Sequence, residues 1–234
     1  MRLRLGAVAV TVSLAAAWPT EASEIRAVPT AGGDARLELV GLIQPGDDAK
    51  LATALRDLPH PTSLALSSLG GNVQAALAIG TMVRDRGLRT IVTPRAICAS
   101  ACGLVWLAGT SRVVGENAHV GLHAAYLRRN GVNVETGAAN ALIGAYLGRL
   151  GFDDRAIVYL TSAAPDEMTW ILPADRQRYG IAFDAGASPA VASSTLPDDY
   201  FLSRPMALAG AIASAAVAAV DRLMGRHAAT AADR

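Results

Sequence analysis

Short apolar segments alternate with longer helical segments along much of the chain. Residues 63–68 and 88–92 are short apolar runs of the kind that form buried strands, and residues 73–86 carry apolar side chains at helical spacing. Strands that alternate with helices of this length predict βαβ units and an α/β fold with a mainly parallel sheet. The same pattern predicts further strands and helices: strands 37–43 and 112–123, and helices 48–57 and 100–108.

Past Tyr126 the pattern becomes mainly helical. The expected helices cover roughly 135–149, 153–163 and 173–179. Gly180 ends the last of them, and a strand-like segment follows at 181–183. We expect these helices to cap the sheet instead of extending it.

The N-terminus has the three parts of a secretory signal. Arg2 and Arg4 precede an apolar run from Leu5 to Trp18, and small residues follow it. The run is shorter than the about 20 residues that cross a bilayer, which favours removal over anchoring. We therefore expect cleavage after Ala22 and a periplasmic or secreted protein.

The length of 234 residues fits one globular domain with extensions at both ends. We expect a signal peptide over 1–22, a flexible lead-in over 23–35, the folded domain over 36–185 and an alanine-rich extension over 186–234. In that extension, residues 206–220 carry no charge. The expectation is a helix that packs on the domain or on a neighbour, with contact to a membrane as the alternative.

The net charge and the sequence motifs argue against several classes of partner and cofactor. The net charge is +1, with 21 basic and 20 acidic residues, and no basic cluster interleaves with aromatic residues, which argues against a nucleic-acid partner. The sequence contains no GxxxxGK[ST] motif, so no ATPase activity is expected. We also expect no cofactor and no metal, because the spacing of His119 and His123 lacks the glutamate of a zinc motif.

The stretch RAICASACGL places Ser100 between Cys98 and Cys102, where a strand is expected to turn into a helix. A serine at a helix start is usually a cap, but the backbone N–H groups there can also hold an oxyanion. A nucleophilic serine needs a base within reach, and histidine is the usual one. At a separation of four residues, a disulfide between the cysteines is possible but not required.

Two further features fit a site at the carboxyl ends of the strands. His119 and His123 lie on one expected strand and on one face of it, and His123 is nearer its carboxyl end, where α/β sheets bind ligands. The turn Leu69-Gly70-Gly71-Asn72 follows an earlier strand, and glycine permits the close backbone approach that an oxyanion hole requires.

Residues 64–126, which run from LALSSLGGN through ICASACGL to HVGLHAAY, resemble the proteolytic subunit of Clp proteases and its exported relatives in the Clp/crotonase superfamily. That family has a Gly-Gly turn, then a nucleophilic serine, then a histidine after the next strand. Here Gly71 lies 29 residues before Ser100, and His123 lies 23 residues after it. A looser similarity extends to about residue 185.

The resemblance implies a serine hydrolase of the peptidase type with stacked ββα units. Ser100 would be the nucleophile and His123 the general base. The N–H groups of Gly71 and Ala101 would form the oxyanion hole, and Gly70 would contact the substrate. Substrates would be short or unfolded peptides, because an exported chain is separated from cytoplasmic unfolding partners.

The sequence does not identify the acidic residue that would complete a triad with Ser100 and His123. The position that matches the family's aspartate holds Met168, so Asp166 or Glu167 would have to orient His123. Because Met168 replaces the family's aspartate, the alternative prediction is a weak or inactive Clp-like scaffold that binds peptides or assembles into oligomers.

Three other mechanisms are expected less than serine hydrolysis with a histidine base. A coenzyme A thioester reaction would use the same oxyanion hole, but coenzyme A is not expected outside the cytoplasm. A nucleophilic Cys98 or Cys102 is disfavoured because exported thiols oxidise. A Ser–Lys mechanism would need Lys50, the only lysine, which lies on the first helix. By resemblance we also expect a homo-oligomer, with contacts through 135–163.

Overall fold

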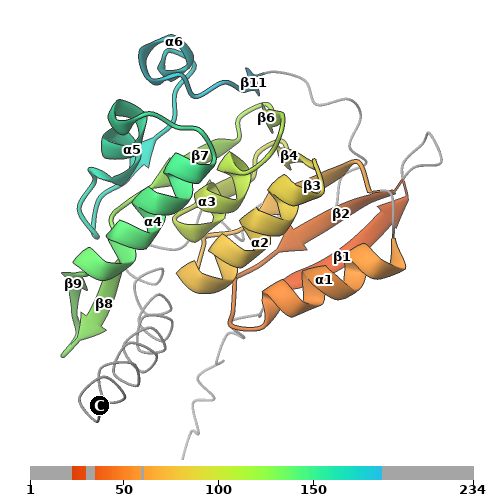
Figure 1. The fold of residues 1–234 in the computed structure, drawn as a ribbon, viewed down its shortest axis with the longest axis horizontal. Coiled ribbons are helices and arrows are strands. Elements are labelled where there is room, and N and C mark those ends of the chain that lie inside the picture. Colours follow the sequence, from red (N-terminus) through yellow and green to blue (C-terminus); the bar gives the residue numbers. More distant parts are fainter. Residues whose placement is uncertain (1–22, 30–34, 59–60, 186–234) are drawn as a thin grey trace, which may run out of the picture.

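The computed structural model describes residues 23–29, 35–58 and 61–185. Its central sheet has six strands in the order β1-β2-β3-β4-β6-β11, and every neighbouring pair is parallel except β1 and β2 (Figure 1). The predicted α/β class with a mainly parallel sheet is therefore confirmed. The strands are β1 (Glu24–Pro29), β2 (Ala35–Val40), β3 (Ser63–Ser67), β4 (Arg89–Val92), β6 (Arg112–Val114) and β11 (Asp184–Ala185).

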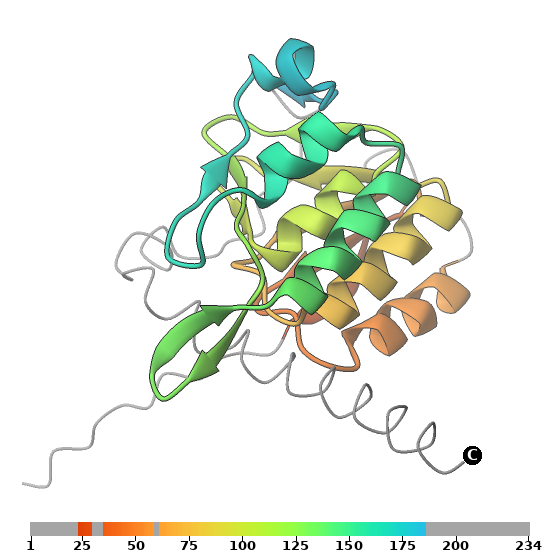
Figure 2. The same ribbon diagram turned by 60° about the vertical axis from the view of Figure 1, so that its left-hand side comes forward.

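Helices α1 (Asp47–Asp57), α2 (Val73–Asp85) and α3 (Ala101–Leu107) follow strands, as the alternation predicted. Helix α2 packs between α1 and α3, and α4 (Gly137–Arg149) lies alongside it (Figure 2). Trp106 of α3 is fully buried, and its indole N–H donates to the carbonyl of Val113 at 3.2 Å. The core thus lies between this helical layer and the sheet.

A second sheet of three strands holds the region around Ser100. Its order is β10-β7-β5, where β5 is Ile97–Ala99, β7 is His119–Leu122 and β10 is Thr169–Trp170. Strands β5 and β7 are parallel, and a single bridge joins Ser68 to Cys98. The predicted strand 112–123 is consequently two strands in different sheets. They part after Val114, where Gly115 packs so closely on Pro94 that a Cβ added to Gly115 would lie 2.7 Å from the Pro94 nitrogen.

The lead-in predicted to be flexible is partly ordered. Residues 24–29 form β1, which pairs antiparallel with all six residues of β2. The Arg26 guanidinium binds the Glu38 carboxylate across this pair, with Nη2 and Oε2 3.0 Å apart. The prediction failed because composition alone does not reveal a pairing between distant segments. Residues 30–34 lie outside the described part.

A β-hairpin precedes the C-terminal helices, where the sequence pattern had suggested only helix. It consists of β8 (Tyr126–Arg129) and β9 (Val132–Glu135). Asn130 and Gly131 form its turn with φ angles of 50° and 81°. An Asn-Gly pair at a two-residue turn is the strongest local signal for a hairpin, and that signal was available in the sequence.

The helical cap follows the hairpin as expected. Helices α4, α5 (Asp154–Thr161) and α6 (Asp175–Tyr179) match the three predicted helices, and the last strand lies at 184–185, after the predicted 181–183. Within the described residues no helix is long and apolar enough to cross a bilayer. The proposed signal peptide over 1–22 and the apolar segment 206–220 lie outside those residues.

Candidate active site

The backbone of Ser100 is in an unusual conformation between β5 and α3. Its φ and ψ angles are 56° and −127°, a region that residues other than glycine rarely adopt. Its N–H donates to the carbonyl of Gly121 at 2.8 Å, and its own carbonyl accepts from the N–H of Gly103 at 2.9 Å. The hydroxyl makes no cap hydrogen bond to α3. A strained strand-to-helix turn of this kind presents a serine hydroxyl to a site instead of to the helix.

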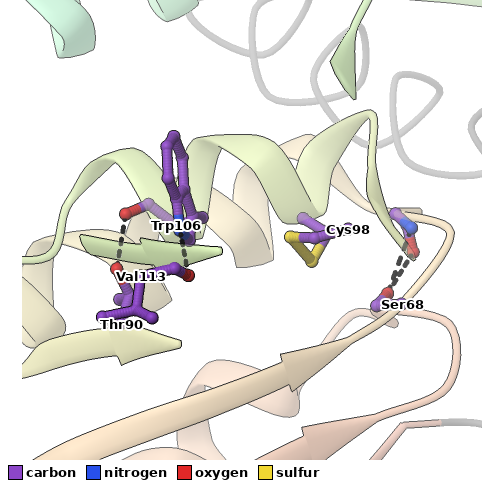
Figure 3. Close-up of a disulfide and its surroundings, with 7 residues drawn as sticks. Ser68, Thr90, Cys98, Trp106 and Val113 are labelled. Atoms are coloured by element: carbon purple, nitrogen blue, oxygen red, sulfur yellow. Dashed lines mark hydrogen bonds between the residues drawn. A yellow bond between two sulfur atoms is a disulfide. The ribbon is translucent and has the colours of Figure 1, made fainter. Parts of the chain in front are cut away.

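Hydrogen bonds hold both backbone groups of Gly70: the carbonyl of the Gly70–Gly71 peptide and the N–H of the peptide before it. The N–H of Ile43 donates to the Gly70 carbonyl at 2.8 Å, and the hydroxyl of Ser68 accepts from the Gly70 N–H at 3.0 Å (Figure 3). Because a trans peptide sets its carbonyl and N–H on opposite sides, the N–H of Gly71 points away from Ile43. Ser68 and Ile43 thus orient the predicted oxyanion donor, a role that the sequence did not reveal.

The glycine turn lies directly against the serine turn. A Cβ built on Gly70 would be 2.7 Å from the Cβ of Ser100 and 2.9 Å from the nitrogen of Ala101. Ala101 is the first residue of α3, so its N–H has no partner within the helix. In the described chain, neither this N–H nor that of Gly71 donates a hydrogen bond to another backbone group. Two free backbone donors therefore lie beside the serine.

His123 follows β7 and lines the same pocket as Ser100. Its Nδ1 lies 2.8 Å from the carbonyl oxygen of Ala124. Since a carbonyl can only accept, this contact places the proton on Nδ1 and leaves Nε2 free to accept one. Burial lowers the pKa of His123, while the Ala124 contact and Asp166 partly oppose the shift, so the ring is neutral at pH 7.

A neutral imidazole with a free Nε2 is the form that a general base requires. No hydrogen bond joins the hydroxyl of Ser100 to the ring of His123, both of which the structure describes. Such bonds are often long in the absence of substrate.

Asp166 acts on His123 without binding it. Its charge raises the pKa of His123, but its Oδ1 accepts from the side-chain amide of Asn133 on β9 at 2.7 Å. Of the two acidic candidates, only Asp166 affects the pKa of His123. Met168 packs on β7, where a Cβ added to Gly121 would lie 2.7 Å from its Cγ. The group that touches Nδ1 is therefore the Ala124 carbonyl and not a carboxylate.

For the serine hydrolysis that the resemblance implies, we expect Asp166→Asn to slow the reaction by less than about 10-fold, whereas the corresponding change of a buried triad aspartate costs about 10⁴-fold. The loss of the negative charge should also move the acid limb of the pH–rate profile to lower pH, because Asp166 raises the pKa of His123. Steady-state kinetics over a range of pH measures both effects. Glu167→Gln is the matched control and should leave the acid limb of the pH–rate profile where it is. A loss near 10⁴-fold in Asp166→Asn would instead show that Asp166 is the third member of a conventional triad.

The pocket that holds Ser100 and His123 is walled mainly by apolar side chains from α2, α3, α4 and α5. Tyr126 and Thr161 add hydroxyl groups to it and were not anticipated from the sequence. The remaining lining residues are Val73, Ala101, Leu104, Leu122, Ala125, Ile143 and Leu160. The surface beside the serine is therefore mainly apolar.

The remaining predicted residues do not line this pocket. Cys98 and Cys102 are joined by a disulfide, with their Cα atoms 5.1 Å apart. His119 is exposed at the other end of β7, and its ring centroid lies 5.9 Å from that of Trp170. Across residues 23–29, 35–58 and 61–185, no group of three His, Cys, Asp or Glu side chains is placed to hold a metal ion.

Comparison with known proteins gives a similarity of fold. No family model matches the chain, and no curated protein matches it by sequence. Among solved structures, ClpP1 from Listeria monocytogenes is 18% identical, with a TM-score of 0.48 over 65% of this chain and 91% of that one. The ClpP protease catalytic domain from Plasmodium falciparum is 17% identical, with a TM-score of 0.47 over 67% and 87%.

A membrane protease specific for a stomatin homolog from Pyrococcus horikoshii is 16% identical, with a TM-score of 0.45 over 64% of this chain and 71% of that one. Members of the family that the sequence resembles are thus among the similar structures. At these identities we take no residue's role from them. The chain itself places a serine on a strained turn, a histidine in the same pocket and two free backbone donors beside the serine.

Proposed function

We propose that the protein is an exported serine peptidase that acts through an acyl-enzyme on Ser100. Nε2 of His123 takes the hydroxyl proton as the oxygen attacks the peptide carbonyl, and the N–H groups of Gly71 and Ala101 stabilise the oxyanion. The C–N bond then breaks, and His123 gives the proton to the leaving amine. Water, activated by the same ring, releases the acid and restores Ser100. The main observation that supports this proposal is the strained backbone of Ser100 beside the pocket.

The substrate side chain next to the attacked carbonyl should be apolar, because the pocket walls are formed by residues such as Leu104, Ile143 and Leu160. We expect short fluorogenic peptides with leucine at that position to be cleaved at least about 10-fold more efficiently than peptides with aspartate there, because burying an unpaired charge in an apolar site is costly. The ratio of kcat/KM values measures this preference, with Ser100→Ala as the blank. Equal rates for the two peptides would contradict it.

Hydrolysis should depend on pH through His123. Its pKa lies below the 6.5 of an unperturbed imidazole, because burial disfavours the charged ring. A protonated Nε2 cannot accept the serine proton, so kcat/KM should be constant near pH 7 and fall about 10-fold per pH unit below that pKa. A pH–rate profile measures this, and an acid limb centred above 6.5 would contradict the neutral, buried ring.

Export and assembly belong to the same proposal. The signal-like N-terminus supports export, and the Cys98–Cys102 disulfide is a bond that persists in oxidising compartments such as the periplasm. We propose a homo-oligomer as well, on the strength of the family resemblance. Fractionation of cells and the mass of the purified protein in solution test these two points separately.

Two observations favour a second function, a Clp-like scaffold that binds peptides with little or no catalysis. The carboxylate of Asp166 binds Asn133, and Met168 stands where the resemblance expects an aspartate. A scaffold would bind the leucine peptides without cleaving them. A folded protein that retains peptide binding, measured by fluorescence anisotropy, but shows no turnover above the Ser100→Ala blank would support the scaffold and contradict the peptidase.

A further inference from the structure

We propose that the Cys98–Cys102 disulfide is a positioning device for Ser100, so that acylation of the serine requires the oxidised bridge. This inference rests on the peptidase function proposed above. It assigns to the two cysteines a part in the reaction without making either of them a nucleophile.

The bridge spans the nucleophile symmetrically. Cys98 lies on β5 two residues before Ser100, and Cys102 lies on α3 two residues after it. The disulfide therefore closes a small covalent ring with Ser100 at its midpoint. The ring also contains Ala101, whose N–H is one of the two oxyanion donors. Both cysteines are 0% exposed, so the bridge is buried beneath the turn (Figure 3).

The hydrogen bonds around the turn fix mainly its strand side. The N–H of Ser68 donates to Ile97 at 2.8 Å, and the N–H of Ala99 donates back to Ser68 at 3.0 Å. The N–H of Ser100 is held by Gly121 on β7. These contacts hold the chain up to the nitrogen of Ser100, which is where the unusual backbone angles begin.

The helix side of the turn has weaker anchoring. The Ser100 hydroxyl does not cap α3, and the bond from the Gly103 N–H to the Ser100 carbonyl lies within the turn itself. Among the described residues, the nearest hydrogen bond from another element is at Leu104, whose carbonyl accepts from the Tyr146 hydroxyl at 3.0 Å. The disulfide ties the first turn of α3 to β5. Without it, Ser100 could relax from a φ of 56° toward a common conformation, which would move its hydroxyl and the Ala101 N–H together.

A small displacement of this kind has a large effect on rate. A shift of about 1 Å in a reacting group can cost about 10²-fold. We therefore expect loss of the bridge to slow acylation by about 10- to 100-fold, with little change in the affinity of the pocket, whose walls belong mostly to other helices.

Reduction with dithiothreitol is the direct perturbation. The S–S bond breaks, each sulfur gains one hydrogen, and the dithiol loses two hydrogens and closes into a cyclic disulfide. Because the bridge is buried, complete reduction must be shown by titration of two thiols per chain. The double variant Cys98→Ala/Cys102→Ala removes the bridge without a reductant and, since these are the only two cysteines, serves as the control for side effects of the reagents.

The experiment measures covalent labelling by a fluorophosphonate over a range of probe concentrations, which separates the limiting acylation rate from the apparent affinity. The samples are the oxidised, reduced and reoxidised protein and the double variant, each checked for folding by circular dichroism. We expect a 10- to 100-fold lower limiting rate in the reduced protein and in the variant, unchanged affinity, full recovery on reoxidation, and no response of the variant to either reagent.

Three results separate the possibilities. Reduced, folded protein that labels within about twofold of the oxidised protein overturns the positioning role. Unfolding of both the reduced protein and the variant also overturns it, because the bridge would then serve overall stability. Oxidised, folded protein that does not label at all contradicts the peptidase function itself.

Discussion

Ser100→Ala should reduce peptide hydrolysis to background, a loss of at least about 10³-fold. The oxyanion hole of a serine hydrolase cannot by itself replace the attacking hydroxyl. The fold should change little, since the Ser100 hydroxyl makes no cap hydrogen bond in the structure. Steady-state hydrolysis of the leucine peptide, together with the denaturant midpoint of each protein, measures the two effects.

Ser162→Ala is the matched control for this substitution. Ser162 also lies at a helix end, but its hydroxyl donates to the carbonyl of Tyr159 at an exposed position. Its removal should leave hydrolysis unchanged. If Ser100→Ala keeps more than about a tenth of the activity, another residue performs the attack.

Gly70→Ala should reduce hydrolysis by about 10²-fold or more. The new Cβ would lie 2.7 Å from both the Ala99 carbonyl oxygen and the Ser100 Cβ, closer than real contacts allow, so the serine turn and the glycine turn must move apart. Displacement of this kind separates the hydroxyl from the oxyanion donors and costs about 10²-fold for each ångström. The measurement is kcat/KM for the same peptide.

Gly46→Ala separates the clash from backbone strain. Gly46 has a φ of 94°, almost the same as the 95° of Gly70, but a Cβ there would meet nothing within 4 Å. Both variants should lose stability from the unfavourable φ, and only Gly70→Ala should also lose activity. Equal activity in the two folded variants would contradict the close apposition of the glycine and serine turns.

The sequence was sufficient to predict helices α1 to α6 and strands β3 and β4, because buried strands and amphipathic helices have different periodicities. It did not predict the division of 112–123 between two sheets or the hairpin beside the site. The relation of Gly71, Ser100 and His123 was implied by the resemblance of residues 64–126 to the Clp family, in which a Gly-Gly turn, a serine and a histidine follow successive strands. These are local signals, and they were carried by turns that contain small residues.

What the sequence did not reveal depends on contacts between distant segments. The bond from the Ile43 N–H to the Gly70 carbonyl involves backbone groups alone, which have no residue-specific signature, and the Ser68 hydroxyl meets the Gly70 N–H only once the turn is formed. The partner of Asp166 is Asn133, on a hairpin that was not predicted, so the question of the third triad member was open until the hairpin was placed. The pairing of β1 was missed for the same reason.

The most direct test of Ser100 as the activated nucleophile is peptide mapping by mass spectrometry after the folded, oxidised protein reacts with a fluorophosphonate. We expect one adduct per chain, on the peptide that contains Ser100, and no adduct in the unfolded protein or in His123→Ala. An adduct on another residue, or none on the folded protein, would contradict the assignment.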